Sequence, residues 1–107
     1  MLASALADGS AHRPCVFEAF ARRLPDGRRY GVVAGTGRLV EAIREFRFGE
    51  TELAYLAASK VADAATLDWL AGYRFTGDID GYPEGELYFP GSPLVTVRAS
   101  FAEAVLL

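Results

Sequence analysis

Prolines and glycines are concentrated in residues 82–97, which read YPEGELYFPGSPLVTV. Proline lacks a backbone N–H donor and glycine adopts turn conformations easily, so neither suits the interior of a helix or a central strand. The apolar pieces between them are too short for helices and alternate as strands do. We therefore predict three short strands, GDIDGY, GELYF and PLVTVRA, with corners at PEG and PGSP.

A second β unit is predicted nearer the N-terminus. CVFEAFARR at 15–23 alternates in the manner of a strand, with Phe17 on one face and Val16 on the other. The turn signal LPDGRR follows, and YGVVA then reads as a returning strand. The pattern predicts an antiparallel hairpin over 15–34.

Helical spacing of apolar residues marks the middle of the chain. The predicted helices are GTGRLVEAIREFRF (35–48), ETELAYLAAS (50–59) and DAATLDWLAGYRF (63–75). Asp63 is a suitable N-cap for the third helix, and Gly72 a suitable end.

A further helix is predicted in SFAEAVLL, where Ser100 and Glu103 have the S-x-x-E spacing of a capping box. No stop signal follows, so we expect this helix to reach Leu107 and to expose the apolar AVLL. Strands and helices are segregated along the chain, which favours an α+β fold. We expect a small α/β sandwich with an antiparallel sheet, a turn-rich β layer and three to four short helices.

Composition narrows the class of protein. A chain of 107 residues with 51% hydrophobic and 23% charged residues fits one globular domain. Its net charge of −3 argues against nucleic-acid binding, which favours a basic surface. The single cysteine, Cys15, cannot form an internal disulfide, and no apolar run approaches the ~20 residues that span a bilayer. We therefore expect a cytoplasmic protein with no membrane partner.

Two pairs of arginines flank the predicted turn of the hairpin. Arg22 and Arg23 end its first strand, and Arg28 and Arg29 begin the return. Guanidinium pairs in this arrangement suit a phosphate clamp, because each can donate two hydrogen bonds to an oxyanion. A solvated hairpin tip balanced by Asp26 is the alternative, and the residues alone leave both open.

Other patterns resemble known functional sites but lack residues that those sites require. YGVVAGTGRLV resembles the start of a dinucleotide-binding fingerprint, but Val40 stands at the third glycine position. The E-G-x(5)-G-x-P-L spacing resembles lipoyl and biotinyl carrier domains, yet the only lysine, Lys60, lies in the helical region. Asp78 and Asp80 are too few ligands for a metal, and the single His12 lacks a partner. We predict no catalytic residue and no metal site.

Several motifs in sequence order resemble the N-terminal region of nicotinate phosphoribosyltransferases. They are F-E-x-F-x-R-R-L-P, the A-G after the second predicted strand, R-F-T-G-D, and E-G-x(3)-F-P-G-x-P-L. The resemblance covers nearly the whole chain. It implies an enzyme of NAD biosynthesis that converts nicotinate and phosphoribosyl pyrophosphate to nicotinate mononucleotide, coupled to ATP hydrolysis and requiring Mg²⁺.

The resemblance also implies an architecture. Members are typically dimers in which a sandwich domain lies beside an irregular α/β barrel, and each active site borrows residues from the partner's sandwich domain. The family's opening D-x-Y-E-L-T-M motif and its barrel are absent from these residues. We therefore expect residues 1–107 to be an N-terminal domain, a fragment that is inactive alone and associates as a homo-oligomer or with the barrel.

By the same resemblance, Arg23 is the best candidate for binding substrate phosphates across the dimer, and Arg22 is the second. No cofactor is expected in this chain itself; Mg²⁺ and ATP belong to the whole enzyme. The alternative is a free-standing, non-catalytic binding or scaffold module of the same fold.

Overall fold

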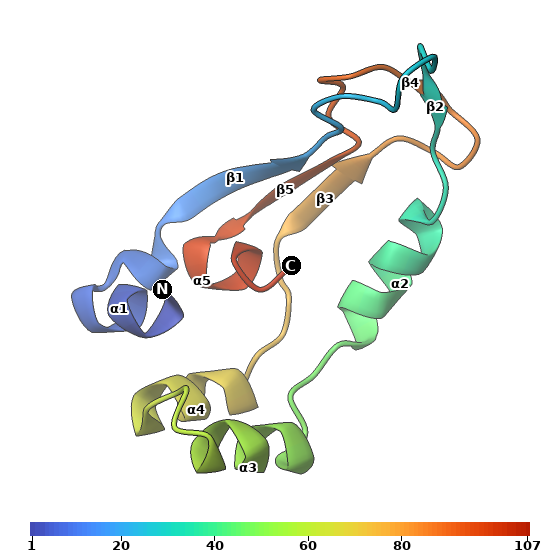
Figure 1. Ribbon diagram of the computed structural model, residues 1–107. Coiled ribbons are helices and arrows are strands. Elements are labelled where there is room, and N and C mark those ends of the chain that lie inside the picture. The colour runs from blue at the N-terminus through green and yellow to red at the C-terminus, as the bar shows by residue number, and fades with distance from the viewer.

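The computed structural model describes all of residues 1–107 as an α+β fold with two small antiparallel sheets (Figure 1). The helical elements are α1 (Leu2–Asp8), the 3₁₀ turn η1 (Ser10–His12), α2 (Thr36–Glu45), α3 (Glu50–Ala58), α4 (Ala64–Ala71) and α5 (Phe101–Ala104). The strands are β1 (Pro14–Ala19), β2 (Gly31–Val32), β3 (Asp78–Gly81), β4 (Leu87–Tyr88) and β5 (Val95–Ser100). The predicted α+β class is confirmed, with α1 as a helix that the sequence reading did not anticipate.

The larger sheet has the strand order β1-β5-β3, so the last strand in the sequence lies at its centre. Val97 of β5 is buried and is paired with Phe17 of β1 and Ile79 of β3. These residues share the apolar face, and the Phe17 ring lies 6.4 Å from that of Phe101 on α5. The alternation predicted for the first strand is confirmed, because Val16 lies opposite Arg98 on the other, polar face.

The predicted hairpin over 15–34 is wrong. β1 pairs with β5, whereas β2 pairs with β4 in a separate two-stranded ribbon that sets Val32 against Leu87. The local turn at Pro25–Arg28 does form, with the amide of Arg28 donating to the carbonyl of Pro25 at 3.0 Å. A local turn fixes only a few backbone bonds, while pairing with β5 lets β1 bury its apolar face, so the long-range pairing prevails.

Two helix caps predicted from the sequence are present. The carboxylate of Asp63 accepts a hydrogen bond from the amide of Thr66 at 2.8 Å, and α4 ends before Gly72. Ser100 and Glu103 form the predicted capping box at the start of α5. The expected continuation of that helix to Leu107 is wrong.

Helix α5 ends at Ala104 because the following turn tightens: the amide of Leu106 bonds the carbonyl of Glu103 and that of Leu107 bonds Ala104. Ala104 is buried, and Val105 and Leu106 are half-buried, so the AVLL segment is mostly covered rather than exposed. Ala102, earlier in α5, belongs to a small core with Ala5 of α1 and Ala11 of η1.

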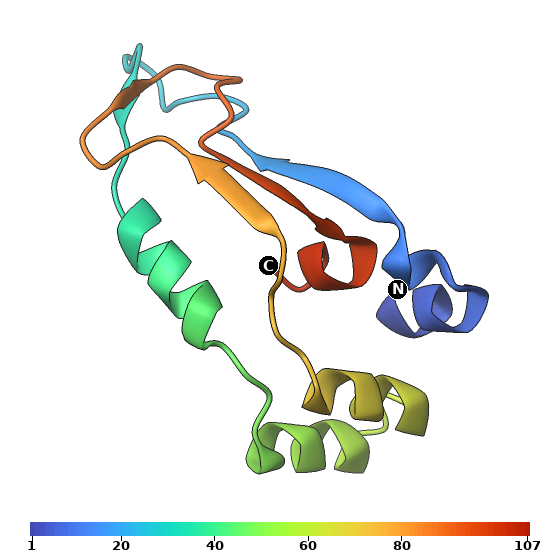
Figure 2. The ribbon, with the colours of Figure 1, turned by 180° about the vertical axis from the view of Figure 1, so that it is seen from behind.

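The fold is less compact than is typical of a chain of its length. Its radius of gyration is 16.5 Å, against about 13 Å for a typical compact chain of this size. Its accessible surface is 7537 Å², against about 5,800 Å² for a typical folded monomer of this mass. Helix α2 stands away from the larger sheet, and α3 and α4 lie together below it (Figures 1 and 2). Only 11 residues are buried, and many large apolar side chains are exposed.

None of the helices combines the length and the hydrophobicity needed to cross a lipid bilayer.

Candidate functional site

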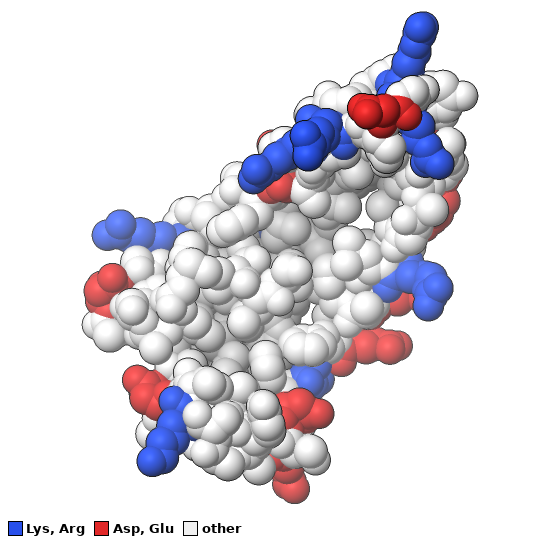
Figure 3. Space-filling model, in the orientation of Figure 1, with Lys and Arg blue, Asp and Glu red and all other residues white.

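The arginine pairs lie in the segment between β1 and β2. Arg22 and Arg23 follow the end of β1, and Arg28 and Arg29 precede β2; all four are exposed. Figure 3 shows basic side chains gathered, with acidic side chains among them, at the end of the molecule formed by this segment and the β2–β4 ribbon. The predicted flanking of a turn by two pairs is therefore present, although the turn does not close a hairpin.

Backbone hydrogen bonds fix the start of this segment. The carbonyl of Ala21 accepts from the amide of Gly91 at 2.9 Å, and the carbonyl of Ala19 accepts from the amide of Leu94 at 2.8 Å. The PGSP corner thus holds the backbone next to Arg22. Gly91 has φ of +85°, a left-handed conformation that side chains with a Cβ disfavour, which explains glycine at this corner.

The four guanidinium groups are free of internal partners. The only salt bridge in the chain joins Arg98 to Asp80, and the arginine side chains that donate hydrogen bonds are those of Arg47, Arg74 and Arg98. Unpaired guanidinium groups gathered at one end produce a local positive potential even though the whole chain is acidic. This end can therefore attract and hold an anion.

A hollow of about 610 Å³ lies beside the second pair and is lined by Arg28, Arg29, Tyr30 and the neighbouring residues Gly27, Gly31 and Val32. At Gly31, one of these lining residues, the Tyr88 ring lies directly against the backbone. The hollow provides a concave surface next to two cations. Phosphate binding by Arg23 and Arg22 stays a prediction.

The G-x-G turn at the start of α2 already holds an anion from within the chain. The carboxylate of Glu84 accepts from the amide of Gly35 at 2.9 Å and from that of Gly37 at 3.1 Å. These bonds, with a further one from Thr36, hold the pKa of Glu84 below its ordinary value. No pyrophosphate is needed here, and β2 runs antiparallel to β4 rather than into a parallel βαβ unit. The G-x-G turn is therefore not the start of a dinucleotide-binding fingerprint.

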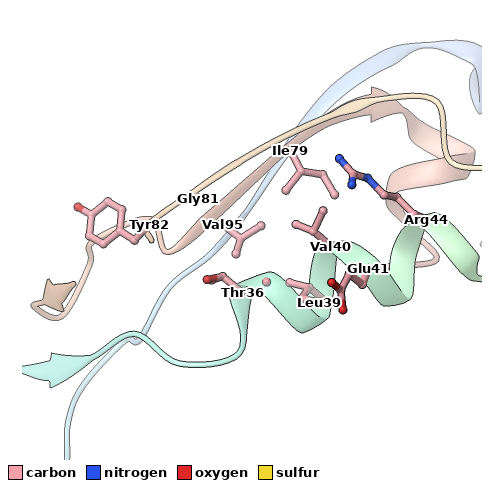
Figure 4. Close-up of a pocket in the computed structure, with 10 residues that line it drawn as sticks. Thr36, Leu39, Val40, Glu41, Arg44, Ile79, Gly81, Tyr82 and Val95 are labelled. Carbon is pink, nitrogen blue, oxygen red and sulfur yellow. The ribbon is translucent and has the colours of Figure 1, made fainter. Parts of the chain in front are cut away.

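A groove of about 390 Å³ separates α2 from β3 (Figure 4). Val40 and Leu39 on the helix and Ile79 and Val95 on the sheet make it largely apolar, with Arg44 near one end. It contains no nucleophile paired with a base. We interpret it as incomplete packing between layers.

A buried carboxylate lies where α5 meets the segment between α4 and β3. Glu103 is 9% exposed and accepts from the amide and hydroxyl of Thr76 and the hydroxyl of Ser100. Burial raises the pKa of Glu103, but the hydrogen bonds from Ser100 and Thr76 outweigh it and leave the pKa below its usual range. Its oxygens are satisfied internally, so Glu103 holds the chain before β3 against α5.

His12 and Tyr73 line the hollow of about 510 Å³ next to Glu103. Tyr73 is 2% exposed, and its hydroxyl has no hydrogen-bond partner. Burial, together with the nearby charge of Glu103, raises the pKa of Tyr73. The side chain of His12 makes no hydrogen bond in the chain. Asp78 and Asp80 do share one face of an edge strand, but nowhere do three or more His, Cys, Asp or Glu side chains gather as a metal site requires.

Over residues 1–107 the chain matches the family described as nicotinate phosphoribosyltransferase (NAPRTase) N-terminal domain. The chain belongs to this family. It is 65% identical over its full length to nicotinate phosphoribosyltransferase pncB1 of Mycobacterium tuberculosis, covering 23% of that protein. It is 35% identical over 100 residues to the nicotinate phosphoribosyltransferase of Bacillus subtilis, covering 94% of this chain and 20% of that one.

The same family relationship is seen in three dimensions. The whole chain superposes on the crystal structure of human nicotinic acid phosphoribosyltransferase with a TM-score of 0.87 and 30% identity. It covers 22% of the human chain. The chain thus spans less than a quarter of the length of the nicotinate phosphoribosyltransferases that it matches.

Glu84 is the residue that sequence reasoning missed in this N-terminal domain. Its partners lie 47 to 49 positions away, so no local spacing identifies it. The available signal was a G-x-G turn at a helix start, which attracts any anion, including a side chain of the same protein.

Proposed function

We propose that this chain is the N-terminal domain of a nicotinate phosphoribosyltransferase. The whole enzyme joins nicotinate to phosphoribosyl pyrophosphate, giving nicotinate mononucleotide and pyrophosphate with coupled ATP hydrolysis, in the cytoplasm. The observation that carries the proposal is 65% identity across all 107 residues to a Mycobacterium tuberculosis protein of that name. Identity at this level favours retention of the domain's role.

The domain's contribution is electrostatic. Negative charge develops on the leaving pyrophosphate in the transition state, and preorganised cations stabilise it. Arg23, with Arg22 beside it, would supply such a cation to the active site of a partner subunit in a homo-oligomer. Their free guanidinium groups and their backbone anchoring through Ala21 support this role.

The chemistry itself would belong to the rest of the enzyme. These 107 residues bring together no nucleophile with a base, and no group of three or more His, Cys, Asp or Glu side chains gathers in them. By the family resemblance, the rest of the enzyme would bind Mg²⁺, ATP and the nicotinate ring. Alone, the chain should form no nicotinate mononucleotide.

An exchange of domains tests the proposal. Residues 1–107 would replace the matched region of Mycobacterium tuberculosis pncB1, which is 65% identical. The chimera should form nicotinate mononucleotide from nicotinate and phosphoribosyl pyrophosphate, whereas the isolated chain should not. A folded but inactive chimera would contradict the proposal and favour a free-standing scaffold module.

The arginines are tested in the same chimera. Arg23→Ala should raise the KM for phosphoribosyl pyrophosphate by about 10-fold or more, because one charge-assisted contact is lost. The KM for nicotinate should change much less. Arg38→Ala on exposed α2 is the matched control. Equal kinetic parameters for the Arg23 and Arg38 variants would show that Arg23 does not contact the substrate.

A further inference from the structure

The segment after β1 that carries the first arginine pair is joined to the PGSP corner just beyond the larger sheet (Figure 1). The register of β1 with β5 sets Ala19 opposite Val95, and two residues further on it would set Ala21 opposite Pro93. Proline has no N–H to donate, so the ladder cannot continue there. The carbonyl of Ala21 instead accepts from the amide of Gly91 at 2.9 Å.

The corner is a type II β-turn, and this turn type directs the amide that makes the bond. The amide of Ser92 donates to the carbonyl of Phe89 at 3.0 Å and closes the turn. Pro90 fixes φ at the second position near about −65°, and Gly91 at the third position has φ of +85°, which together define type II. In a type I turn ψ at the second position is about −30° rather than about +120°. The peptide between these positions would then be turned over, and its N–H would point away from Ala21.

The bond to Gly91 sets the orientation of the peptide that begins the next residue, Arg22. The carbonyl of Ala21 and the nitrogen of Arg22 belong to one planar group, so fixing the carbonyl also fixes the nitrogen. On the far side of the pair, the amide of Arg28 donates to the carbonyl of Pro25 and closes a local turn. The stretch between these two fixed points is short, so its backbone has little freedom to redirect the first pair.

From this arrangement we infer that Gly91 is a positioning residue for phosphate recognition by Arg22 and Arg23. The turn that glycine permits directs the Gly91 amide at the carbonyl of Ala21, and this bond sets the direction of the pair. Guanidinium groups bind phosphate through hydrogen bonds of defined geometry, and ordering the pair in advance lowers the entropic cost of binding. The inference rests on the proposed function, in which the pair binds phosphoribosyl pyrophosphate. Gly91 itself would not contact the substrate.

The PEG corner supplies a matched control because it is built in the same way. The amide of Glu86 donates to the carbonyl of Pro83 at 3.2 Å, and Gly85 at the third position has φ of +84°. The Gly85 amide also donates to a distant carbonyl, that of Val33, at 2.9 Å. Both corner glycines have open space where a Cβ would lie. Valine therefore imposes a similar conformational penalty at either corner, but only the PGSP corner bonds the segment that carries the first pair.

Kinetics of the domain-exchange chimera test the inference. Valine disfavours positive φ, so Gly91→Val should raise the KM for phosphoribosyl pyrophosphate by about 3- to 10-fold. The KM for nicotinate should change much less. Gly91→Asn should be close to the unaltered chimera, because asparagine adopts positive φ more readily. In a background that carries both Arg22→Ala and Arg23→Ala, Gly91→Val should cause no further rise, because it acts only through the pair.

The control variant, Gly85→Val, should leave both KM values unchanged. An equal rise in the two valine variants overturns the inference, as does a further rise from Gly91→Val when the arginines are absent. Circular dichroism checks that each variant is folded. If Gly91→Val does not fold, Gly91→Ala takes its place, with the same expected direction of change.

Proteolysis of the same chimera measures the anchoring without relying on activity. Trypsin cleaves after arginine, and cleavage requires a backbone segment that can leave its folded position. Gly91→Val should speed cleavage after Arg22 and Arg23 by about 3-fold or more, measured by mass spectrometry of the fragments. Gly85→Val should not. Equal cleavage rates in the two variants overturn the inference, even if the chimera is inactive.

Failure of this inference differs measurably from failure of the proposed function. If Arg23→Ala raises the KM for phosphoribosyl pyrophosphate but Gly91→Val does not, the positioning role of Gly91 is refuted and the proposed function stands. If Arg23→Ala leaves that KM unchanged, the proposed contact with the substrate is refuted, and the positioning role is refuted with it.

Discussion

Both carboxylate oxygens of Glu84 lie 2.9 Å from the backbone nitrogen of Gly35. Glu84 belongs to the PEG corner between β3 and β4, and Gly35 precedes the first turn of α2. The corner is therefore joined to a helix that otherwise stands away from the sheet (Figure 1). The negative charge also compensates the partial positive charge at the helix start.

Removal of this carboxylate should loosen α2. In Glu84→Ala the amides of Gly35 and Gly37 lose their partner, so the thermal midpoint should fall and amide exchange along 36–45 should accelerate. Exchange in β5 should change little. Glu86→Ala is the control, since its exposed side chain makes no hydrogen bond in the chain. Unchanged exchange in α2 would contradict a role for Glu84 in holding the helix.

Stability should decrease in acid partly through Glu103. Its pKa is depressed in the folded state relative to the ordinary 4.5, so the unfolded chain binds more protons as the pH falls. The stabilisation is complete above the unfolded pKa and is lost as the pH falls through the folded one. Urea unfolding from pH 7 to pH 3 should show this loss, and Glu103→Gln should make the curve flatter.

The contribution of Glu103 to the free energy of unfolding can be measured at neutral pH. Glu103→Ala leaves the amide of Thr76 and the hydroxyl of Ser100 without their acceptor. The free energy of unfolding should fall by about 2 kcal/mol, a usual value for hydrogen bonds to a charged group. Glu45→Ala at the exposed end of α2 should change it much less. Equal losses in the two variants would refute the assigned role.

Tyr73→Phe should not destabilise the domain. The Tyr73 hydroxyl is buried without a partner, which costs about 1–3 kcal/mol of desolvation, while its ring packs against those of Phe46, Phe48 and Trp69. The variant keeps the ring and removes the orphaned group, so the unfolding free energy should be equal or higher. Tyr55→Phe at an exposed site should be neutral. A clear loss of stability in Tyr73→Phe would mean that the hydroxyl has a partner.

The PGSP corner should tolerate asparagine better than valine. Gly91 has φ of +85° and open space where a Cβ would lie, so the penalty is conformational rather than steric. Gly91→Val should cost about 1–2 kcal/mol of unfolding free energy, and Gly91→Asn should cost less, because asparagine adopts this region more readily. Similar unfolding free energies for the two variants would indicate that the corner rearranges.

Some features of the fold could be predicted because they depend on interactions between residues that are close together in the sequence. The Asp63 cap and the Ser100–Glu103 box each join residues three positions apart, and alternation assigned Phe17 to the apolar face. The partner of β1 was not predictable, since the turn at 25–28 suggested a neighbouring strand. The burial that selects β5 depends on contacts about 80 residues away.

The candidate site was predictable only in part. Arg22 and Arg23 stand out as a pair in the sequence, and the structure places them on an anchored, exposed segment. The sequence could not show that the Gly91 corner supplies the anchor. Nor could it show that Glu84 fills the anion site at α2, because both contacts join segments that are brought together only by the tertiary fold.

The open arrangement of the layers has a calorimetric consequence. The heat capacity of a typical chain of 107 residues rises by about 1.4 kcal/mol/K on unfolding. Most of this rise comes from the hydration of apolar groups that are shielded from water in the native state. Here only 11 residues are buried, so much of that hydration is already present before unfolding. The domain alone should therefore melt over a broad temperature range with a small heat-capacity step. A sharp, cooperative transition should develop only as its apolar surfaces are covered.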